Sequence, residues 1–356
     1  MDDPLFEKRA GPDGDAEDAS DSSSADAAGD GRAPWVPLVL MPFLMVTAFV
    51  LVIMLFGWLG LSGDDPEELV ARLQRADRTG FRDAVTLVQM LREPAGQHLR
   101  RDEQLARALI RLLQDELAAG RMEDDRIQLR SFLCRALGEF ERDEVLSPLL
   151  DAAETERDAR EIDVRRSALE AIAQFVAARP SVPSTVDDRL LHTLLAATRR
   201  PASDQADEAS EAARDAQLAT AAFALGILDR PEAHDRLVVL LEDRSVDVRY
   251  NAAAGLARWG REEAAPVLLE MLDGQTASPQ DVRATARQRV WRRQIVTRSA
   301  LRSLELLWAA DARLEWDPLL AAVRRLARDP HDLNIRNQAR RTLQALEAPQ
   351  RAGFND

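Results

Sequence analysis

The stretch LEDRSVDVRYNAAAGLARWGREEAAPVLLEML, residues 241–272, decides the fold of this chain. Its apolar residues recur every three or four positions, which is the spacing of a helix and not of a strand. Two such runs, at 248–259 and 264–273, are separated by the short polar stretch GREE. The alanines of the first run allow a neighbouring helix to approach closely, and the leucines fill the space between helices. The stretch therefore predicts two helices packed as a pair.

The same pattern returns along most of the chain. Phrases similar to VRYNAAAGLARW begin at Leu129, Val164, Leu218, Val248, Val296 and Ile335. In each phrase a central Ala or Leu is followed four positions later by an anchor residue, and these anchors are Leu137, Ile172, Leu225, Leu256, Leu304 and Leu343. A second apolar run, such as VLSPLLDAA or AAPVLLEMLD, flanks each phrase. Helix pairs of this kind cannot close a core alone, so each pair must bury its face against the next.

The whole region is predicted to be helical, because no convincing alternating strand pattern occurs. We expect an all-α fold, an α-solenoid that occupies residues 63–346. About seven helix pairs are expected at 66–92, 102–139, 142–177, 186–228, 231–259, 261–308 and 315–346. Long connections near 200–214 and 273–286 interrupt the period and could carry a partner-specific feature.

Residues 241–272 resemble HEAT repeats, in particular the bacterial HEAT-like subtype. That family places an Asp before one helix of the pair and an Arg about six residues later. The pairs with this spacing, or with one extra residue, are Asp124 with Arg130, Asp243 with Arg249, Asp329 with Arg336, and Asp158 with Arg165. The phrase from Leu218 lacks the Arg. The resemblance implies that these residues form a structural polar ladder between successive repeats.

The resemblance also bears on function. An extended repeat array implies a scaffold or adaptor that binds protein partners. Some bacterial HEAT-like proteins are similar to phycobilisome lyases, which leaves an enzyme as the alternative. The residues do not support one, because no phosphate-binding loop, metalloprotease motif, nucleophile elbow or CxxC pair occurs. Cys134, the single cysteine, lies among core positions, and the four histidines show no ligand spacing. We therefore predict no cofactor, no metal and no enzymatic activity.

A long uncharged stretch predicts a membrane anchor. Residues 33–63 carry no charge, and Trp35 and Trp58 are about 35 Å apart along a helix, enough to cross a hydrocarbon core of about 30 Å. Indoles favour the headgroup boundary, so both tryptophans fit as interface anchors. A cleaved signal peptide and a buried core helix are the alternatives. We predict a transmembrane helix at 34–62, placed in a bacterial inner (cytoplasmic) membrane.

The segments outside the anchor and the solenoid are expected to be unstructured. Residues 1–33 are rich in Asp, Ser, Ala and Gly, which predicts a disordered acidic tail, and 347–356 are expected to be a flexible tail. Only Arg32 lies close before the anchor, whereas four arginines, at 72, 75, 78 and 82, follow it. The positive-inside rule therefore favours a cytoplasmic C-terminal domain.

One helix stands out by its charge. Residues 282–304 contain seven arginines and no acid. On a helical wheel Trp291, Ile295, Arg298 and Arg302 fall on one stripe, which we take as the candidate partner-binding surface. The alternatives are that Trp291 and Ile295 pack under the 273–286 connection, or that the arginines bind an anionic lipid headgroup. Nucleic acid is an unlikely ligand by composition, since the middle of the chain is acidic and few aromatics accompany the arginines.

Overall fold

The computed structural model describes residues 80–179, 184–200, 208–274, 284–329 and 332–347. The chain divides into two compact units, 1–63 and 64–356, and every described residue belongs to the second. The predicted acidic tail, the predicted transmembrane helix at 34–62 and nearly all of the C-terminal tail lie outside the described residues. Among the helices that are described, none is both long enough and apolar enough to cross a bilayer.

Every regular element in the described ranges is a helix, as predicted. After α3 (Gly80–Arg92) the α-helices come in consecutive pairs. The pairs are α4 (Glu103–Ala119) with α5 (Asp124–Gly138), α6 (Leu146–Glu154) with α7 (Ile162–Ala177), α8 (Ser184–Ala197) with α9 (Glu208–Leu225), α10 (Pro231–Leu240) with α11 (Val246–Arg258), α12 (Ala265–Asp273) with α13 (Ala286–Ala309), and α14 (Trp316–Leu326) with α15 (Leu333–Glu347). Short 3-10 turns, such as η4 (Ala159–Glu161), fill several connections.

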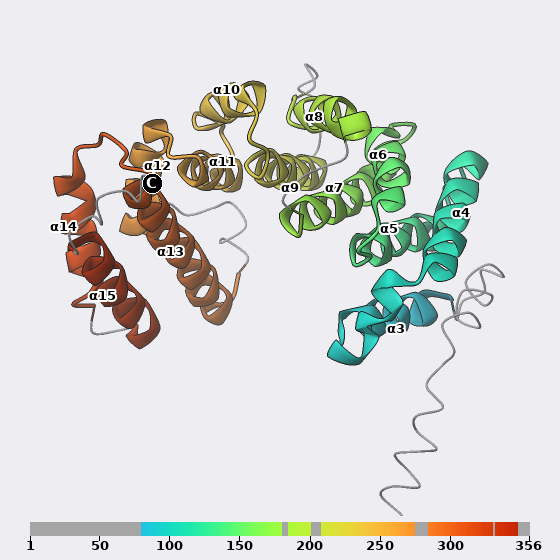
Figure 1. Cartoon of the computed structure of the whole chain (residues 1–356), viewed down its shortest axis with the longest axis horizontal. Coiled ribbons are helices and arrows are strands. Elements are labelled where there is room, and N and C mark those ends of the chain that lie inside the picture. The colour runs from blue at the N-terminus through green and yellow to red at the C-terminus, as the bar shows by residue number, and fades with distance from the viewer. Residues whose placement is uncertain (1–79, 180–183, 201–207, 275–283, 330–331, 348–356) are drawn as a thin grey trace, which may run out of the picture. The chain divides into compact units, whose positions relative to one another are not determined.

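The pairs stack into two layers (Figure 1). Each odd-numbered helix from α3 to α15 packs on the next odd-numbered helix, and this forms one continuous layer. The even-numbered helices cover it, each packing on the odd-numbered helix that follows it. The described part of the second unit is therefore an α-solenoid, and the prediction of an all-α repeat fold is confirmed.

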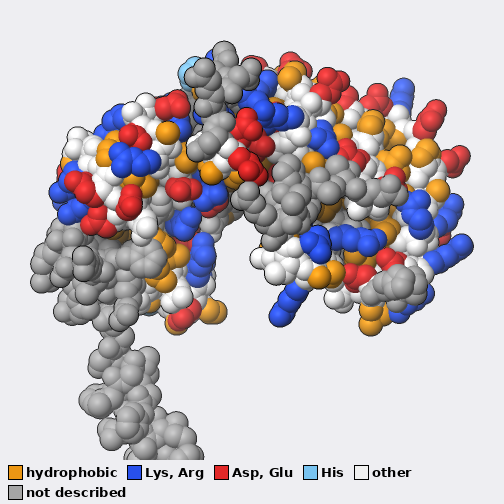
Figure 2. All heavy atoms as spheres, turned by 180° about the vertical axis from the view of Figure 1, so that it is seen from behind, with side chains coloured by type: hydrophobic (Ala, Val, Ile, Leu, Met, Phe, Trp, Pro, Cys, Tyr) orange, Lys and Arg blue, Asp and Glu red, His pale blue; other side chains and the backbone are white. Residues whose placement is uncertain are grey.

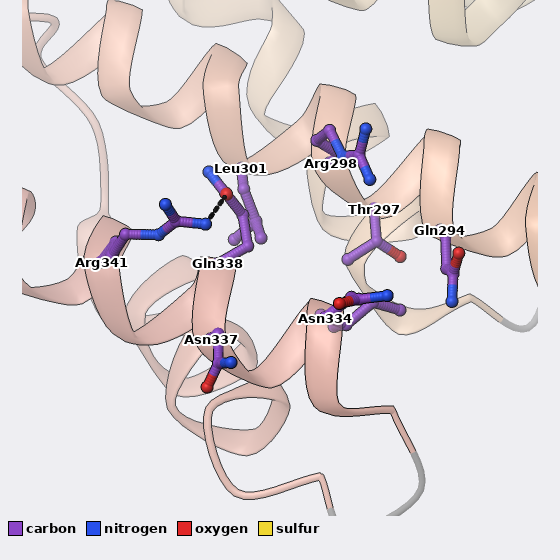
Figure 3. A pocket seen from close by; sticks show the side chains of 9 residues that line it. Gln294, Thr297, Arg298, Leu301, Asn334, Asn337, Gln338 and Arg341 are labelled. Atoms are coloured by element: carbon purple, nitrogen blue, oxygen red, sulfur yellow. Dashed lines mark hydrogen bonds between the residues drawn. The ribbon is translucent and has the colours of Figure 1, made fainter. Parts of the chain in front are cut away.

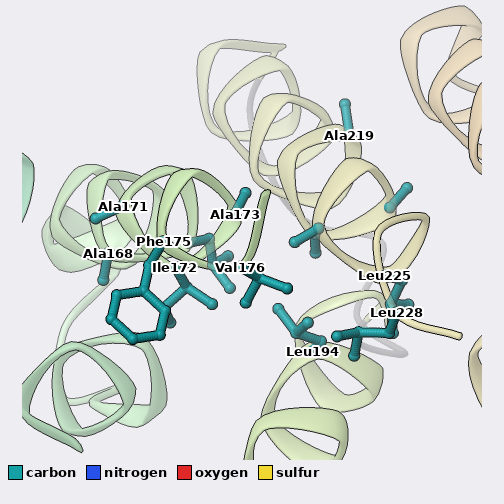
Figure 4. Close-up of a cluster of buried hydrophobic side chains, with 14 of the residues drawn as sticks. Ala168, Ala171, Ile172, Ala173, Phe175, Val176, Leu194, Ala219, Leu225 and Leu228 are labelled. Atoms are coloured by element: carbon teal, nitrogen blue, oxygen red, sulfur yellow. The ribbon is translucent and has the colours of Figure 1, made fainter. Parts of the chain in front are cut away.

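The core forms from the residues that carry the repeat. The anchor residues at 137, 172, 225, 256 and 304 have no exposed surface, and Leu343 on α15 is half-buried. Figure 4 shows Val176 of α7, Leu194 of α8 and Leu225 of α9 in one apolar cluster. Burying such a side chain contributes about 1.5–3 kcal/mol, and only stacking of neighbouring pairs removes its last faces from water.

Small residues set how closely the odd-numbered helices approach. A Cβ atom built on Gly226, just after α9, would lie 2.5 Å from the Cα of Gly255 on α11. A Cβ built on Gly138 at the end of α5 would lie 2.7 Å from the Cβ of Ala171 on α7. Neither distance leaves room for a methyl group, so the repeat-to-repeat contact requires glycine at both places.

One predicted connection is shorter than expected. The sequence reading placed a connection near 200–214, but α9 already begins at Glu208. The segment EASEAARDAQ is rich in alanine, a strong helix former, and Glu208 and Glu211 lie in the first turn, where negative charge stabilises the helix. Glu208 and Ser210 are exposed, so they lie on the solvent face of the helix instead of marking a loop. The expectation of an irregular segment over 208–214 was therefore wrong.

Candidate functional site

The helix α13 extends beyond its partner. With 24 residues it is much longer than α12, which has 9. Its start is fixed by Thr285, whose side chain and backbone form a capping box with Gln288. All of its buried residues lie from Thr297 onward, so residues 286–296 include none. The first half of α13 therefore has no buried side chain and offers its sides to a ligand.

The predicted stripe on α13 is at the surface. Trp291 is 64% exposed and Ile295 is 43% exposed, and Val290 beside them is 54% exposed. Arg298 and Arg302 are exposed and form no ion pair with another described residue. The opposite face of the helix carries Ala300, Leu304 and Leu307, which are fully buried. The structure therefore places all four predicted residues together on the face turned away from the core. Residues 275–283 of the 273–286 connection lie outside the described ranges.

Two polar contacts hold this half of α13 in place. Arg292 forms an ion pair with Asp247 of α11, and the side-chain amide of Gln294 donates to Asp332 at 2.8 Å, just before α15. Burial acts to raise the pKa of Asp332, but hydrogen bonds from Ile335, Gln294 and Asn334 outweigh it and lower the pKa below its usual value. The Asp332 carboxylate is therefore fully engaged within the protein.

A polar cleft lies between α13 and α15, next to the stripe. It has a volume of about 440 Å³ and shares Arg298 with the stripe (Figure 3). Its lining residues on α13 are Gln294, Thr297, Arg298 and Leu301, and those on α15 are Asn334, Ile335, Asn337, Gln338 and Arg341. On both helices the spacing is i, i+3, i+4, i+7, so each helix turns one stripe toward the other.

The sequence analysis did not single out the α15 side of this cleft. Asn334, Asn337, Gln338 and Arg341 are polar residues on a helix, and such residues ordinarily read as a solvent face. Two features of the sequence could have identified them. One is their helical spacing, and the other is the pair of consecutive amide side chains, Asn337 and Gln338. The contact between α13 and α15 that makes them a cleft wall is not visible in the sequence.

Charge is mixed elsewhere on the surface. Figure 2 shows acidic and basic side chains interspersed over one face of the described residues. A second cavity of about 480 Å³, between α6, α7, α8 and α9, illustrates this, because charges of both signs line it and several of them are paired. Arg200 donates to Asp215 and Asp243, both at 2.6 Å, and Glu154 accepts from Arg189 and Thr193. Part of the lining of that cavity is therefore a structural ion-pair network.

Several residues of the expected polar ladder connect repeats, and their side-chain ion pairs are with residues outside the ladder. Arg130 on α5 donates to Glu161 at 2.8 Å, and Arg249 on α11 donates to Glu270 on α12 at 2.6 Å. Arg249 also donates to the main-chain carbonyl of Asp243 at 3.0 Å, whereas the Asp243 carboxylate accepts from Arg200 of the preceding repeat. Each arginine thus reaches forward to the next helix pair.

The remaining ladder residues differ from one another in their contacts. Asp329 lies 3.6 Å from Arg293 of the preceding repeat, and the Nε of Arg336 has no hydrogen-bond partner among the described residues. Asp124 is inside the first turn of α5 instead of before it. Asp158 caps η4 by accepting from the backbone of Arg160. Arg165 pairs with Glu156 instead of with Asp158.

The structure does not favour Cys134 as a nucleophile. Cys134 is fully buried on α5, and burial raises the pKa of its thiol to about 12. A thiol of this kind stays protonated and does not attack a substrate. The described residues also contain no group of three or more His, Cys, Asp or Glu side chains arranged to hold a metal ion.

Comparison with known families bears on the repeat itself. The family model described as HEAT repeats matches residues 204–290. The matched segment contains the stretch 241–272, on which the resemblance to HEAT repeats rests, and it ends just before Trp291. Among curated proteins, none matches the chain in sequence.

Solved structures similar to this chain include an engineered protein, a designed armadillo repeat protein and an enzyme. An engineered protein has a TM-score of 0.40 at 16% identity, with 80% of this chain and 68% of that chain covered. A designed armadillo repeat protein has a TM-score of 0.34 at 22% identity, with coverage of 73% and 98%. Human deoxyhypusine hydroxylase in complex with glycerol has a TM-score of 0.27 at 18% identity, with coverage of 75% and 96%. At these TM-scores none of the likenesses informs function.

Proposed function

We propose that this chain is a membrane-tethered HEAT-repeat scaffold that binds a protein partner through the exposed stripe of α13. The observation that carries the proposal is the exposure of Trp291 and Ile295, at 64% and 43%, on a helix whose second half is anchored by the buried residues Ala300, Leu304 and Leu307. HEAT and armadillo-like repeats typically serve as interaction scaffolds, which supports the general class.

The chemistry of the stripe suits a protein interface. Tryptophan and arginine are enriched among the residues that carry most of the binding energy in interfaces. When a partner covers a large apolar side chain that is otherwise in water, its burial contributes about 1.5–3 kcal/mol to binding. Arg298 and Arg302, which lack ion-pair partners among the described residues, can then bind acidic or carbonyl groups at the rim.

The tether is the second part of the proposal. The uncharged stretch 34–62, with Trp35 and Trp58 at its ends, supports a single transmembrane helix in a bacterial inner membrane. The arginines at 72, 75, 78 and 82 support a cytoplasmic C-terminal domain. A tether would raise the effective concentration of the solenoid towards partners in the same membrane, as expected for an assembly or accessory factor of a membrane complex.

Crosslinking in native membranes tests the proposal. We expect one protein to be crosslinked to the full chain and to be lost when Trp291 and Ile295 are both replaced by alanine. The control is Val239→Ala on α10, because Val239 is also apolar and is 60% exposed, but lies on another helix. Retention of the crosslinked partner in the double variant would show that the stripe is not the binding surface.

A further inference from the structure

We propose that the cleft between α13 and α15 binds an extended, acidic segment of the partner, whose main chain pairs with the side-chain amides of the cleft and whose carboxylates pair with Arg298 and Arg341. This inference rests on the proposed function and names the chemistry of the partner. The cleft and the stripe share Arg298, so one partner can cover both.

The amides of the cleft match the groups of a peptide main chain. A primary amide offers donors and an acceptor side by side, as does each peptide unit. Asn334 and Asn337 form no side-chain hydrogen bond with another described residue, so both are available to a ligand. Gln338 accepts from Arg341 at 2.9 Å and keeps its amide hydrogens for a carbonyl.

The spacing of the stripe fits an extended segment. Asn334 and Arg341 are seven residues apart, which is about 10 Å along a helix. An extended chain advances about 3.3 Å per residue, so about three peptide residues would span this distance. The volume of about 440 Å³ also lies within the range of about 300–1,000 Å³ that is usual for ligand sites.

The charge of the cleft selects an acidic ligand. Arg298 and Arg341 come from opposite helices, and Figure 3 shows both at the cleft. Neither forms an ion pair with a described residue, and the nearby Asp332 is occupied by Gln294 and by two main-chain amides. Carboxylates that pair with these guanidinium groups would receive charge-assisted hydrogen bonds, which are the strongest kind available here.

The floor of the cleft holds an unmade hydrogen bond. Thr297 is 1% exposed, and its Oγ1 has no hydrogen-bond partner among the described residues. Leaving a buried hydroxyl unsatisfied costs about 1–3 kcal/mol. Because Gln294 and Asn334 lie beside Thr297 in Figure 3, a ligand that shifts either amide can bring a partner to this hydroxyl. The free protein therefore leaves a polar group unsatisfied at the place where the ligand is proposed to bind.

A peptide is favoured over the two other anionic partners. A lipid headgroup or a nucleic acid presents phosphates, which are recognised by clusters of cations instead of neutral amides. The α15 wall of the cleft carries three amides for one arginine. Neutral amides in that proportion suit a ligand with many main-chain groups and few charges.

Peptide binding to the purified full chain in detergent provides the test. The probe is a fluorescent, capped octapeptide of alternating Asp and Ala, and its two control peptides carry Asn in place of Asp or N-methylated main-chain amides. We expect either control peptide to bind at least about tenfold more weakly, a loss of about 1.4 kcal/mol. We expect the same loss of affinity when the probe binds the chain with Asn334→Ala/Asn337→Ala or the chain with Arg341→Gln. Arg258→Gln, an exposed arginine on α11, is the charge-matched control and should bind normally.

Four results would overturn the inference. The first is equal binding of the N-methylated peptide, which would mean that charge alone is recognised. The second is an equal loss with Arg258→Gln. The third is displacement of the probe by anionic vesicles or by an oligonucleotide at lower concentration than by the unlabelled peptide. The fourth is about tenfold tighter probe binding after deletion of residues 1–32, which would assign the cleft to the chain's own acidic tail.

The crosslinking experiment separates this inference from the proposed function. If Trp291→Ala/Ile295→Ala loses the partner but Asn334→Ala/Asn337→Ala keeps both partner and probe, the cleft inference fails and the scaffold proposal stands. If the partner persists when Trp291 and Ile295 are replaced but the probe still requires the α15 amides, the proposed interface fails instead. Unchanged circular dichroism and unfolding midpoint would show that each variant is folded.

Discussion

Arg130 and Glu161 form an ion pair in which both side chains are buried. Arg130 Nη1 donates to Glu161 Oε1 at 2.8 Å, and the two side chains are 0% and 1% exposed. The pair joins α5 to η4 of the next repeat, and Arg130 Nη2 also donates to the main-chain carbonyl of Arg121. Arg157 binds the same carboxylate at 2.7 Å. Successive repeats are therefore connected by a polar network as well as by leucine packing.

Removing one member of this pair should destabilise the chain strongly. Glu161→Ala leaves the Arg130 guanidinium buried without its carboxylate, which costs about 3–5 kcal/mol. Replacing both residues by apolar ones of similar size should recover most of that loss. Urea unfolding of the full chain, followed by circular dichroism, measures the effect. The control is Glu347→Ala, which breaks the exposed pair with Arg324 and should cost less than about 1 kcal/mol. Equal effects of the two substitutions would contradict the role of burial.

The Glu161 carboxylate should make the free energy of unfolding depend on pH. Burial acts to raise the pKa of Glu161, but hydrogen bonds from Arg157 and the charge of Arg130 lower it below the ordinary value of about 4.3. A pKa that is lower in the folded state gives a contribution that is complete above about pH 4.3 and lost as the pH falls through the folded value. We expect the free energy of unfolding of the wild type to fall more steeply in this range than that of Glu161→Gln. Identical slopes would show that Glu161 does not titrate with folding.

Gly226 and Gly255 approach closely, and the sign of the stability change on replacing Gly255 tests this contact. At an open helix position, replacing glycine by alanine stabilises by about 1 kcal/mol. A Cβ on Gly255 would lie 2.7 Å from the Cα of Gly226, so we expect Gly255→Ala to destabilise by about 1–3 kcal/mol. A double-mutant cycle with Gly226→Ala should show coupling, because the two backbones touch. A stabilising Gly255→Ala would mean that α9 and α11 do not pack this closely.

The thiol of Cys134 should react only after unfolding. Its pKa is raised to about 12 by burial, and the side chain has no exposed surface. We expect an aromatic disulfide reagent at mildly alkaline pH to label the native chain far more slowly than the chain in concentrated urea. Rapid, stoichiometric labelling of the native chain would place Cys134 at the surface and would reopen the question of a nucleophile.

The helical array could be predicted because its signal is local. The repeated Ala and Leu positions at 221 and 225, or 252 and 256, are spaced for one face of a helix, and that face is buried in the structure. The start of α9 was missed for a local reason as well, because a Ser, Asp and Ala-rich segment also fits a loop. Alanine-rich sequence and acidic first-turn residues favour the helix there.

The polar contacts could not be predicted in the same way. Arg130 finds its partner 31 residues away in the next repeat, and spacing within one helix says nothing about such a contact. The candidate cleft is similar, because Asn334 and Gln294 are brought together only when α15 packs on α13. The stripe of Trp291 and Ile295 was recognised in advance, but the sequence left open whether it faces solvent. Its exposure depends on α13 being longer than α12.

Oxidative footprinting of Trp291 tests the proposed interface most directly. The full chain would be exposed to hydroxyl radicals in native membranes, in detergent, and in liposomes of pure lipid, with Trp316 on α14 as the internal reference. We expect Trp291 to be oxidised several-fold more slowly in native membranes than in the other two states, because only there does a protein partner cover it. Equal oxidation in all three states would contradict the interface, and protection in pure liposomes would assign the surface to lipid instead.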